Sequence, residues 1–226
     1  IIGLMITFIA FTVPLPYYIE VPGTSEDIRK VLQVNNQSDQ EEGSYQFVTV
    51  GVKHARMVDL VYAWLTPFTD IRSAKEMTGG SSDAEFMRIN QFYMETSQNM
   101  AKYQGLKAAG KEIELKYLGV YVLTVTDNST FKGILNIADT VTAVNDKTFE
   151  SSKEMVDYVN SQTLGDKVKV TYQEDGKVKT AEGKIITLEN GKNGIGIGLI
   201  DRTEVSSDVP IKFSTAGIGG PSAGMM

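Results

Sequence analysis

The chain has 226 residues, which is enough for one or two domains with a buried core. Hydrophobic residues make up 42 % of it and charged residues 22 %, a composition typical of globular proteins that excludes disordered and collagen-like chains. The formal net charge of -6 opposes binding to a phosphate backbone, so nucleic acid is not expected as a partner.

Cysteine is absent, and His54 is the only histidine. This excludes zinc fingers, cysteine nucleophiles and disulfide frameworks, and it leaves one imidazole for any Ser-His-Asp triad. A metal site built mainly from carboxylates remains open, although no motif points to a metal or a cofactor. Nucleophilic catalysis would therefore depend on serine, threonine or lysine.

The first 19 residues carry no charge, and Glu20 is the first charged residue. Such a run is close to the ~20 residues that cross a bilayer, while Pro14 and Pro16 predict that a helix ends near Val13. Tyr17 and Tyr18 follow where an interfacial aromatic belt would lie. We interpret residues 1–16 as the end of a single-pass membrane anchor with the bulk of the chain outside the cell. A cleaved signal peptide and a buried core helix are the alternatives.

Residues 17–112 are predicted to form a mixed region of strands and helices. Strand patterns cover 17–23 and 45–52, with a polar stretch at 35–44 between them. Asp59–Leu65 is apolar enough to predict a buried turn or helix. A longer helix should begin at Ser82 or Asp83 and end near Ala109, with Gly110 after it. Its buried side is expected to carry an apolar stripe that packs in the core: Phe86, Ile89, Phe92, Tyr93 and Met100.

From Glu112 onwards the pattern changes to short strands and turns. A strand, a loop and a second strand are predicted over 113–126, and a strand leading into an Asn-Asp turn over 139–149. Residues 151–162 are predicted to form a helix capped by Ser151 or Ser152. Residues 167–186 are predicted to form a hairpin that turns at Asp175-Gly176.

The stretch from Tyr117 to Leu188 resembles a PDZ domain, for which we predict the boundaries 113–190. Tyr117-Leu118-Gly119-Val120 matches the apolar-Gly-apolar pattern of that family's carboxylate-binding loop. The segment Asp139–Asn145 is similar to the family signature G-D-x-I-x-x-V-N-G, with Ala138 and Asp146 replacing its first and last glycines.

The PDZ resemblance implies that a peptide terminus binds at the loop and adds as a strand along Tyr121–Val125. The residues expected to bind it are Leu118, Gly119, Val120, Val122, Met155 and Val159. The alternative reading is that these residues are simply core.

Residues 191–226 contain a serine between small residues, Gly220-Pro221-Ser222-Ala223-Gly224. Small neighbours leave room for a scissile carbonyl and its oxyanion donors. As G-x-S-x-G alone the pattern has little specificity. An α/β-hydrolase elbow would need strand-helix alternation before the serine and a histidine after it, and a phosphate loop would need a Lys-Ser or Lys-Thr pair. The chain offers neither.

The longer string from Gly219 to Gly224 resembles the signature around the catalytic serine of Lon-type proteases. The resemblance implies an α+β chain with an anchor end, a mixed region (17–112), a PDZ domain and the start of a Lon-type proteolytic domain (191–226). It further implies a secreted, ATP-independent Ser-Lys endopeptidase of the kind found in Gram-positive bacteria. Ser222 would be the nucleophile, and neither metal nor cofactor would be needed.

Several further expectations rest on the same resemblance. Substrates would be secreted peptides, signalling peptides among them, or small membrane proteins, and Lon-type domains tend to form homo-oligomeric rings. The family's general-base lysine follows several tens of residues after the serine, so we expect these 226 residues alone to be inactive. A non-catalytic PDZ adaptor at the cell surface and a surface structural protein are the competing hypotheses.

Overall fold

The computed structural model describes residues 2–215 and 218–220, which fall into two compact units. The first unit contains the residues up to Phe86 together with the segment from Lys212 to Ile218. The second unit runs from Met87 to Ile211 and includes Gly219 and Gly220.

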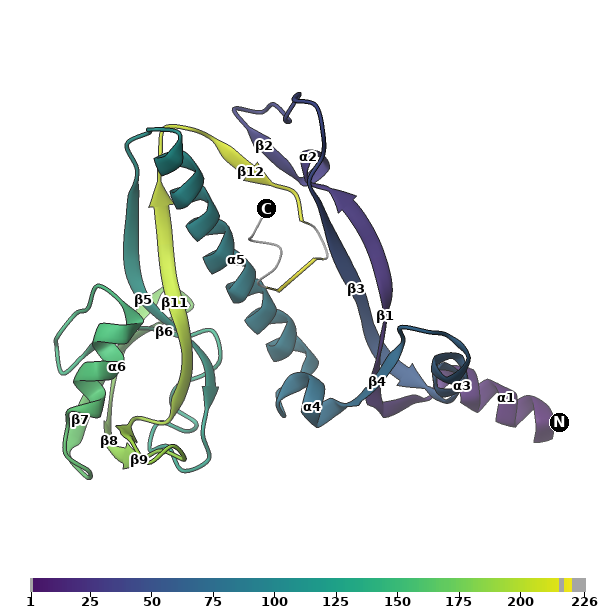
Figure 1. Ribbon diagram of the computed structural model, residues 1–226. Helices are drawn as coiled ribbons and strands as arrows, with labels where there is room; N and C mark the ends of the chain where they lie inside the picture. The colour runs from purple at the N-terminus through teal and green to yellow at the C-terminus, as the bar shows by residue number, and fades with distance from the viewer. Residues whose placement is uncertain (1, 216–217, 221–226) are drawn as a thin grey trace. The chain divides into compact units, whose positions relative to one another are not determined.

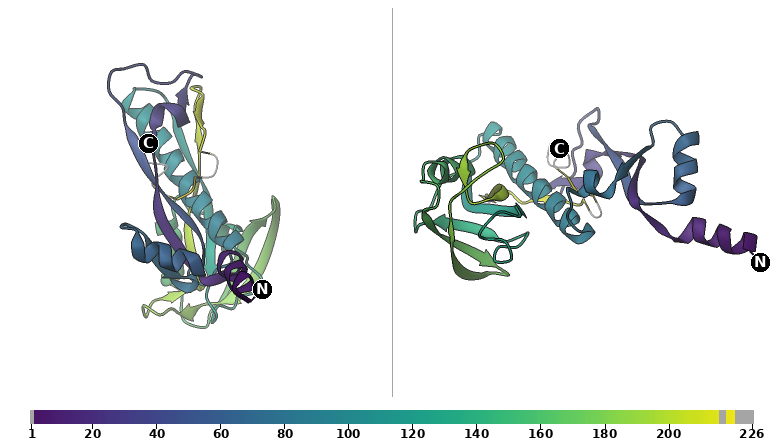
Figure 2. Two further views of the ribbon diagram at one scale, coloured as in Figure 1. Left: turned by 90° about the vertical axis from the view of Figure 1, so that its right-hand side faces the viewer. Right: turned by 90° about the horizontal axis from the view of Figure 1, so that it is seen from below.

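The first unit is built on a long antiparallel ribbon of β1 (Pro14–Asp27) and β3 (Gln46–Arg56), which lie side by side in each view (Figure 1, Figure 2). Strand β4 (Asp70–Ser73) pairs with the other edge of β1, so the strand order is β3-β1-β4. The smaller elements are α2 (Ile28–Val31), α4 (Ala74–Thr78) and the paired strands β2 (Leu32–Val34) and β12 (Ile211–Phe213).

Helix α1 (Ile2–Thr12) ends where Pro14 begins the first strand, which confirms the predicted helix end. No helix in the described part of the chain is long and apolar enough to cross a membrane. Tyr18, predicted to lie in an aromatic belt beside Tyr17, is buried instead. Its ring stacks on His54, and its hydroxyl donates a hydrogen bond to Asp83.

Helix α3 (Met57–Leu65) forms where the sequence predicts a turn or helix, but the prediction that this segment is buried is wrong. Asp59 is its only buried residue. Most of its apolar side chains are exposed, with Trp64 and Leu65 at 84 % and 68 %.

Helix α5 (Asp83–Ala108) confirms the long helix predicted from Ser82 or Asp83. At its first turn the Ser82 N–H donates a hydrogen bond to the Glu85 carboxylate, and the Glu85 N–H donates one to the Ser82 hydroxyl. Gly110 follows the last turn with a φ of 68°. Phe92 and Leu106 are buried, whereas Met100, predicted on the buried side, is 42 % exposed. The helix face toward the core is therefore narrower than the apolar stripe suggests.

The second unit is built on an antiparallel sheet with the strand order β11-β5-β6-β7-β8. Its strands are β5 (Glu114–Val125), β6 (Thr140–Val144), β7 (Lys167–Glu174), β8 (Lys177–Lys184) and β11 (Ile197–Ser206). A two-stranded sheet of β9 (Ile186–Thr187) and β10 (Asn193–Gly194) precedes β11. The boundary predicted at residue 190 thus falls before the last strand of the main sheet.

Helix α6 (Ser152–Asn160) begins at Ser151, whose side chain accepts a hydrogen bond from the Glu154 N–H. The β7–β8 hairpin turns at Asp175 and Gly176, which have φ values of 47° and 78°. Positive φ at both turn residues is what a two-residue hairpin requires, as the Asp-Gly pair predicts.

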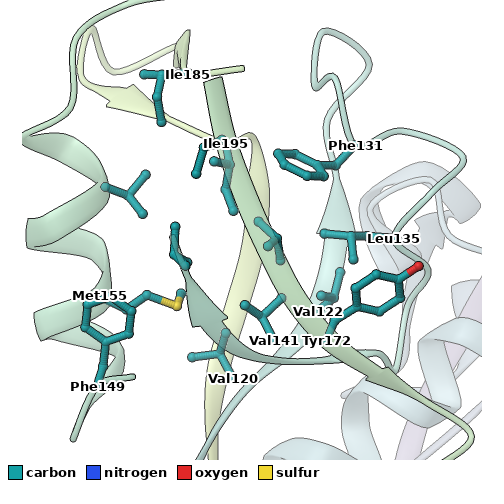
Figure 3. Packing of buried hydrophobic residues seen from close by; sticks show 14 residues of the cluster. Val120, Val122, Phe131, Leu135, Val141, Phe149, Met155, Tyr172, Ile185 and Ile195 are labelled. Carbon is teal, nitrogen blue, oxygen red and sulfur yellow. The ribbon is translucent and has the colours of Figure 1, made fainter. Parts of the chain in front are cut away.

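The core of this unit lies between α6, the loop around Phe131 and the inner face of the sheet (Figure 3). Its fully buried members are mostly β-branched residues of neighbouring strands, as expected for sheet positions with one face covered. The core contains Val120, Val122, Phe131, Val141, Val144, Met155, Val159, Val168, Val170, Ile185 and Ile195, among others.

Candidate functional site

Strand β5 is paired on both sides in its middle. Val120 pairs with Asp201 of β11 on one side and with Val141 of β6 on the other, and Tyr121 pairs with Ile200 and Thr140. An added peptide needs unpaired backbone groups on a sheet edge, so a peptide cannot pair with β5 at Tyr121 and Val122. The prediction of a binding edge is wrong at these two residues, where the predicted edge begins.

The predicted loop Leu118–Val120 and the predicted binding residue Val122 all belong to β5. Gly119 has a φ of 130°, and a Cβ there would lie 2.2 Å from the Val141 carbonyl oxygen. The glycine is therefore needed for close approach to β6 and not to a peptide terminus. Val120 and Val122 are fully buried in the core, and Leu118 is half-buried.

Strand β11 is the edge strand of the sheet. The carbonyl of Asp201 accepts from the Thr96 hydroxyl at 2.8 Å, and that of Thr203 accepts from the Asn99 amide at 2.7 Å. Both carbonyls therefore point away from β5. Backbone groups alternate along an antiparallel strand, so the N–H and C=O of Ile197 and Leu199 point to the same outer side. In the described part of the chain β11 pairs only with β5, which leaves an edge at Ile197–Leu199.

The loop before β11 has its carbonyls turned toward the turn at Thr126–Ser129. The Ile195 carbonyl accepts from the Ser129 hydroxyl at 2.6 Å, and the Gly196 carbonyl accepts from the Thr126 N–H at 2.9 Å. Because the C=O and N–H of one trans peptide unit point in opposite directions, the N–H groups of Gly196 and Ile197 point away from this turn. Two successive N–H groups of this kind form an anion-binding concavity.

Gly196 has to be glycine for two reasons. Its φ is 73°, and a Cβ would lie 2.5 Å from Thr126 Oγ1 and 2.8 Å from Ser129 Cβ. A side chain would push apart the loop and turn that hold the two carbonyls inward.

Hydrogen bonds tie both ends of α6 to this part of the chain. The Ser152 N–H donates to Asp201 Oδ1 at 3.0 Å, and the Asn193 side chain donates to the Gln162 carbonyl at 2.8 Å. A carboxylate is favoured at a helix N-terminus by the unpaired N–H groups and the helix dipole. We call the edge Ile197–Leu199, the loop Asn193–Gly196 and α6 together the β11–α6 site.

The base of the β11–α6 site is apolar. Met155 and Val159 of α6 are buried in the core, and Ile197 and Leu199 pack against the same core. Met155 and Val159 are thus the two predicted peptide-binding residues that lie at this site. Their contribution to a pocket for a terminal side chain stays a prediction.

Tyr117 lies beside the Asp201 end of the site. Its hydroxyl is buried and has no hydrogen-bond partner within residues 2–215 and 218–220. Burial raises the pKa of Tyr117 well above its usual range, and the charges of Asp201 and Glu154 add to the effect. The hydroxyl is therefore neutral and keeps its proton.

Helix α5 packs against β5 and β11 on the face of the sheet that points away from the core around α6. The Phe92 ring stacks on the Tyr121 ring with centroids 3.9 Å apart, and the Arg202 guanidinium lies 5.2 Å from the centroid of the Tyr121 ring. This packing places Thr96 and Asn99 at the edge of β11. The helix therefore blocks the β11 edge beyond Asp201.

Ser222, the predicted nucleophile, lies outside the described residues. Gly220, two positions before it, has a φ of 100° and donates its N–H to the Asn90 carbonyl at 3.1 Å. In the first unit, His54 Nε2 lies within hydrogen-bonding distance of Asp83 Oδ2, at 2.6 Å. No cluster of three or more metal-ligating side chains occurs in the described ranges.

Sequence reasoning missed the loop and strand that form the site. The signal was the Gly194-Ile195-Gly196-Ile197 run, in which glycine alternates with isoleucine just before a strand. We assigned this run to the segment after the PDZ-like stretch, because a more familiar apolar-Gly-apolar pattern occurs at Leu118–Val120.

Comparisons with known proteins agree with this architecture. Residues 91–185 match the sequence profile of the PDZ domain family. The chain is 35 % identical to the solved PDZ domain of an SdrC-like protein from Listeria monocytogenes, over 38 % of this chain and 93 % of that one, with a TM-score of 0.37. The chain is 38 % identical to the solved PDZ domain of an SdrC-like protein from Listeria innocua, over 36 % of this chain and 92 % of that one, with a TM-score of 0.35. A search of curated proteins found no match. The chain therefore contains a PDZ domain.

Proposed function

We propose that the PDZ domain binds the C-terminus of an extended peptide at the β11–α6 site. The terminal carboxylate accepts hydrogen bonds from the N–H groups of Gly196 and Ile197. The peptide then pairs antiparallel with the edge at Ile197–Leu199. The observation that carries this proposal is the inward turn of the Ile195 and Gly196 carbonyls, which aims two successive N–H groups at one point.

The apolar base of the site sets the preferred terminal residue. Leu199 from the strand and Val159 from the helix pack against one core, so the last side chain of the peptide meets an apolar surface. A peptide ending in a branched aliphatic residue buries that side chain there, whereas a terminal Asp or Lys would lose hydration without gaining a partner.

The test uses peptides selected for binding from a random library with free C-termini. Fluorescence anisotropy then compares each selected peptide with its C-terminal amide. We expect amidation to weaken binding at least tenfold, because it removes the charge that the two N–H groups recognise. Equal affinities of acid and amide would refute carboxylate recognition.

We also propose that the protein is an ATP-independent serine endopeptidase, anchored in the membrane by residues 1–16 with its bulk outside the cell. The support is the resemblance of Gly219–Gly224 to the Lon-type serine signature. Ser222 would attack the scissile carbonyl, and a lysine of lowered pKa from a following segment would accept its proton. The PDZ domain would select substrates, and the proteolytic domains would assemble into a ring.

The peptidase proposal is tested in the protein as its full reading frame encodes it, here called the longer chain. Ser222→Ala should abolish cleavage of a bound peptide without changing its affinity, whereas Ser206→Ala, an exposed serine of β11, should leave turnover unchanged. The 226 residues alone should be inactive. Binding without serine-dependent cleavage in the longer chain would identify the protein as an adaptor.

A further inference from the structure

Helix α3 presents apolar side chains to water. Trp64 is 84 % exposed, and Phe68 in the turn after the helix is 89 % exposed. Met57, Leu60, Val61, Tyr62 and Leu65 are also exposed. Contiguous exposed apolar surface of this kind marks a protein or membrane interaction site.

The only charge of α3 is turned away from this surface. Asp59 is buried, accepts from the Arg56 N–H at 2.8 Å and pairs with Lys53 Nζ at 3.0 Å. Burial alone would raise the pKa of Asp59, but the Arg56 N–H and Lys53 lower it overall, so the carboxylate stays ionised in the fold. The outer face of α3 therefore carries no charge.

Helix α1 emerges beside α3. Pro14 at the start of β1 pairs with Arg56 at the end of β3, so both helices leave the same end of the ribbon, and they contact each other (Figure 1). All described residues of α1 are uncharged and nearly all of them are exposed. The two helices thus form one charge-free surface, which we call the α1–α3 surface.

Phe68 adds an independent observation. It has a φ of 59°, a left-handed conformation that is strained for a bulky residue, and yet its ring is not buried by the protein. Strain of this kind is characteristic of functional surfaces.

We propose that α3 docks on a lipid bilayer, with Trp64 and Phe68 in the interfacial region, as a second membrane contact beside α1. Nine residues are too few to span a bilayer, so α3 lies on it. Aromatic side chains favour the interface, and the exposed Arg56 directly before α3 is a cation that can pair with lipid phosphates. This inference rests on the proposed membrane anchoring through residues 1–16 and does not depend on peptide binding or cleavage.

Trp64 is the only tryptophan of the chain and reports on α3 directly. The chain is mixed with vesicles of phosphatidylcholine and phosphatidylglycerol, either plain or with brominated acyl chains. We expect the Trp64 emission to shift to shorter wavelength and to be quenched at least twofold by the brominated lipid. Co-sedimentation with the vesicles measures binding through α1 separately.

The double variant Leu65→Glu, Phe68→Asn replaces two apolar side chains next to Trp64 by a charged and a polar one and keeps Trp64; asparagine tolerates the left-handed conformation. It should lose most of the quenching while still sedimenting with vesicles. Val178→Glu, at a valine of β8 that is 66 % exposed, is the control and should behave as the unchanged chain. Circular dichroism verifies folding of each variant.

Three outcomes would overturn the proposal. One is unquenched Trp64 in the unchanged chain, whether or not the chain sediments. Another is equal quenching in the unchanged chain and the double variant. The third is a concentration-dependent increase in mass, abolished by the double variant and accompanied by no quenching, because a second copy of the chain would then cover the surface.

Discussion

The carboxylate of Asp201 accepts a hydrogen bond from the backbone N–H of Ser152 at 3.0 Å, which fixes the edge strand β11 to the first turn of α6. The two elements are far apart in the sequence, and this contact holds them at the Asp201 end of the β11–α6 site. The Asp201 carboxylate therefore contributes both to the position of α6 at the site and to the stability of the fold.

Replacing Asp201 should weaken both the fold and the site. Asp201→Ala removes the acceptor at the helix N-terminus and should lower the free energy of unfolding by about 1 kcal/mol. Peptide affinity should fall several-fold, because α6 loses its fixed distance from β11. Urea denaturation and anisotropy measure the two effects. Glu204→Ala, an exposed site on the same strand, is the control, and equal behaviour of the two variants would contradict the role of Asp201.

Helix α5 should limit the length of peptide that the site binds. Thr96 and Asn99 occupy the Asp201 and Thr203 carbonyls, so only the edge before Asp201 is available. At ~3.4 Å per residue this edge pairs with roughly four peptide residues. In a series of three to eight residues with a common C-terminus, affinity should rise to about four residues and then stay within about twofold. Continued tightening beyond six residues would show that α5 does not block the strand.

Replacing Gly196 in the loop by alanine should cost more stability than the same change at Gly191, which has a similar backbone conformation. Gly191 has a φ of 77° with no atom within 4 Å of a Cβ, so Gly191→Ala should cost about 1 kcal/mol from backbone strain alone. Gly196→Ala adds overlap with Thr126 and Ser129 and should cost about 3 kcal/mol. Thermal or urea unfolding compares the two, and similar losses would mean that the loop relaxes freely.

Asp139 should make the fold less stable as the pH rises. Burial raises the pKa of Asp139, with the Asn136 N–H lowering it in part, so the folded state binds this proton more tightly than the unfolded state. Stability should therefore fall as the pH rises from the unfolded value of about 3.9 through the folded one. Asp139→Asn keeps an acceptor for Asn136 and removes the titration. Its stability relative to the unchanged chain should increase with pH in urea unfolding; a constant difference would exclude the effect.

Local patterns in the sequence predicted local elements well. The Asp175-Gly176 turn, the Ser151 cap of α6 and the length of α5 depend on neighbouring residues and match the structure. Pairing of β11 with β5 depends on residues distant in the chain, and no local signal names the partner of an edge strand. As a result, the loop at Leu118–Val120 was interpreted as a terminus-binding loop, although its glycine serves strand packing.

Helix α3 shows a second reason for a wrong prediction. Its apolar residues predicted burial, because hydrophobicity in a sequence indicates that a side chain avoids water and not which surface covers it. Asp59 did not indicate in the sequence that the charge faces inward, since a single carboxylate in an apolar run is compatible with a solvated turn. Only its contacts with Arg56 and Lys53 show that the charge faces inward.

The central claim, that a peptide adds to β11 and not to β5, is tested by amide resonances of the chain in the presence of a selected peptide with a free C-terminus. The Gly196, Ile197 and Leu199 N–H groups should shift strongly and exchange more slowly with solvent, since they gain hydrogen bonds. The Val122 N–H, already bonded to the Asp139 carbonyl at 2.8 Å, should change little. Protection at Tyr121–Val125 with unchanged signals for Gly196 to Leu199 would contradict the account.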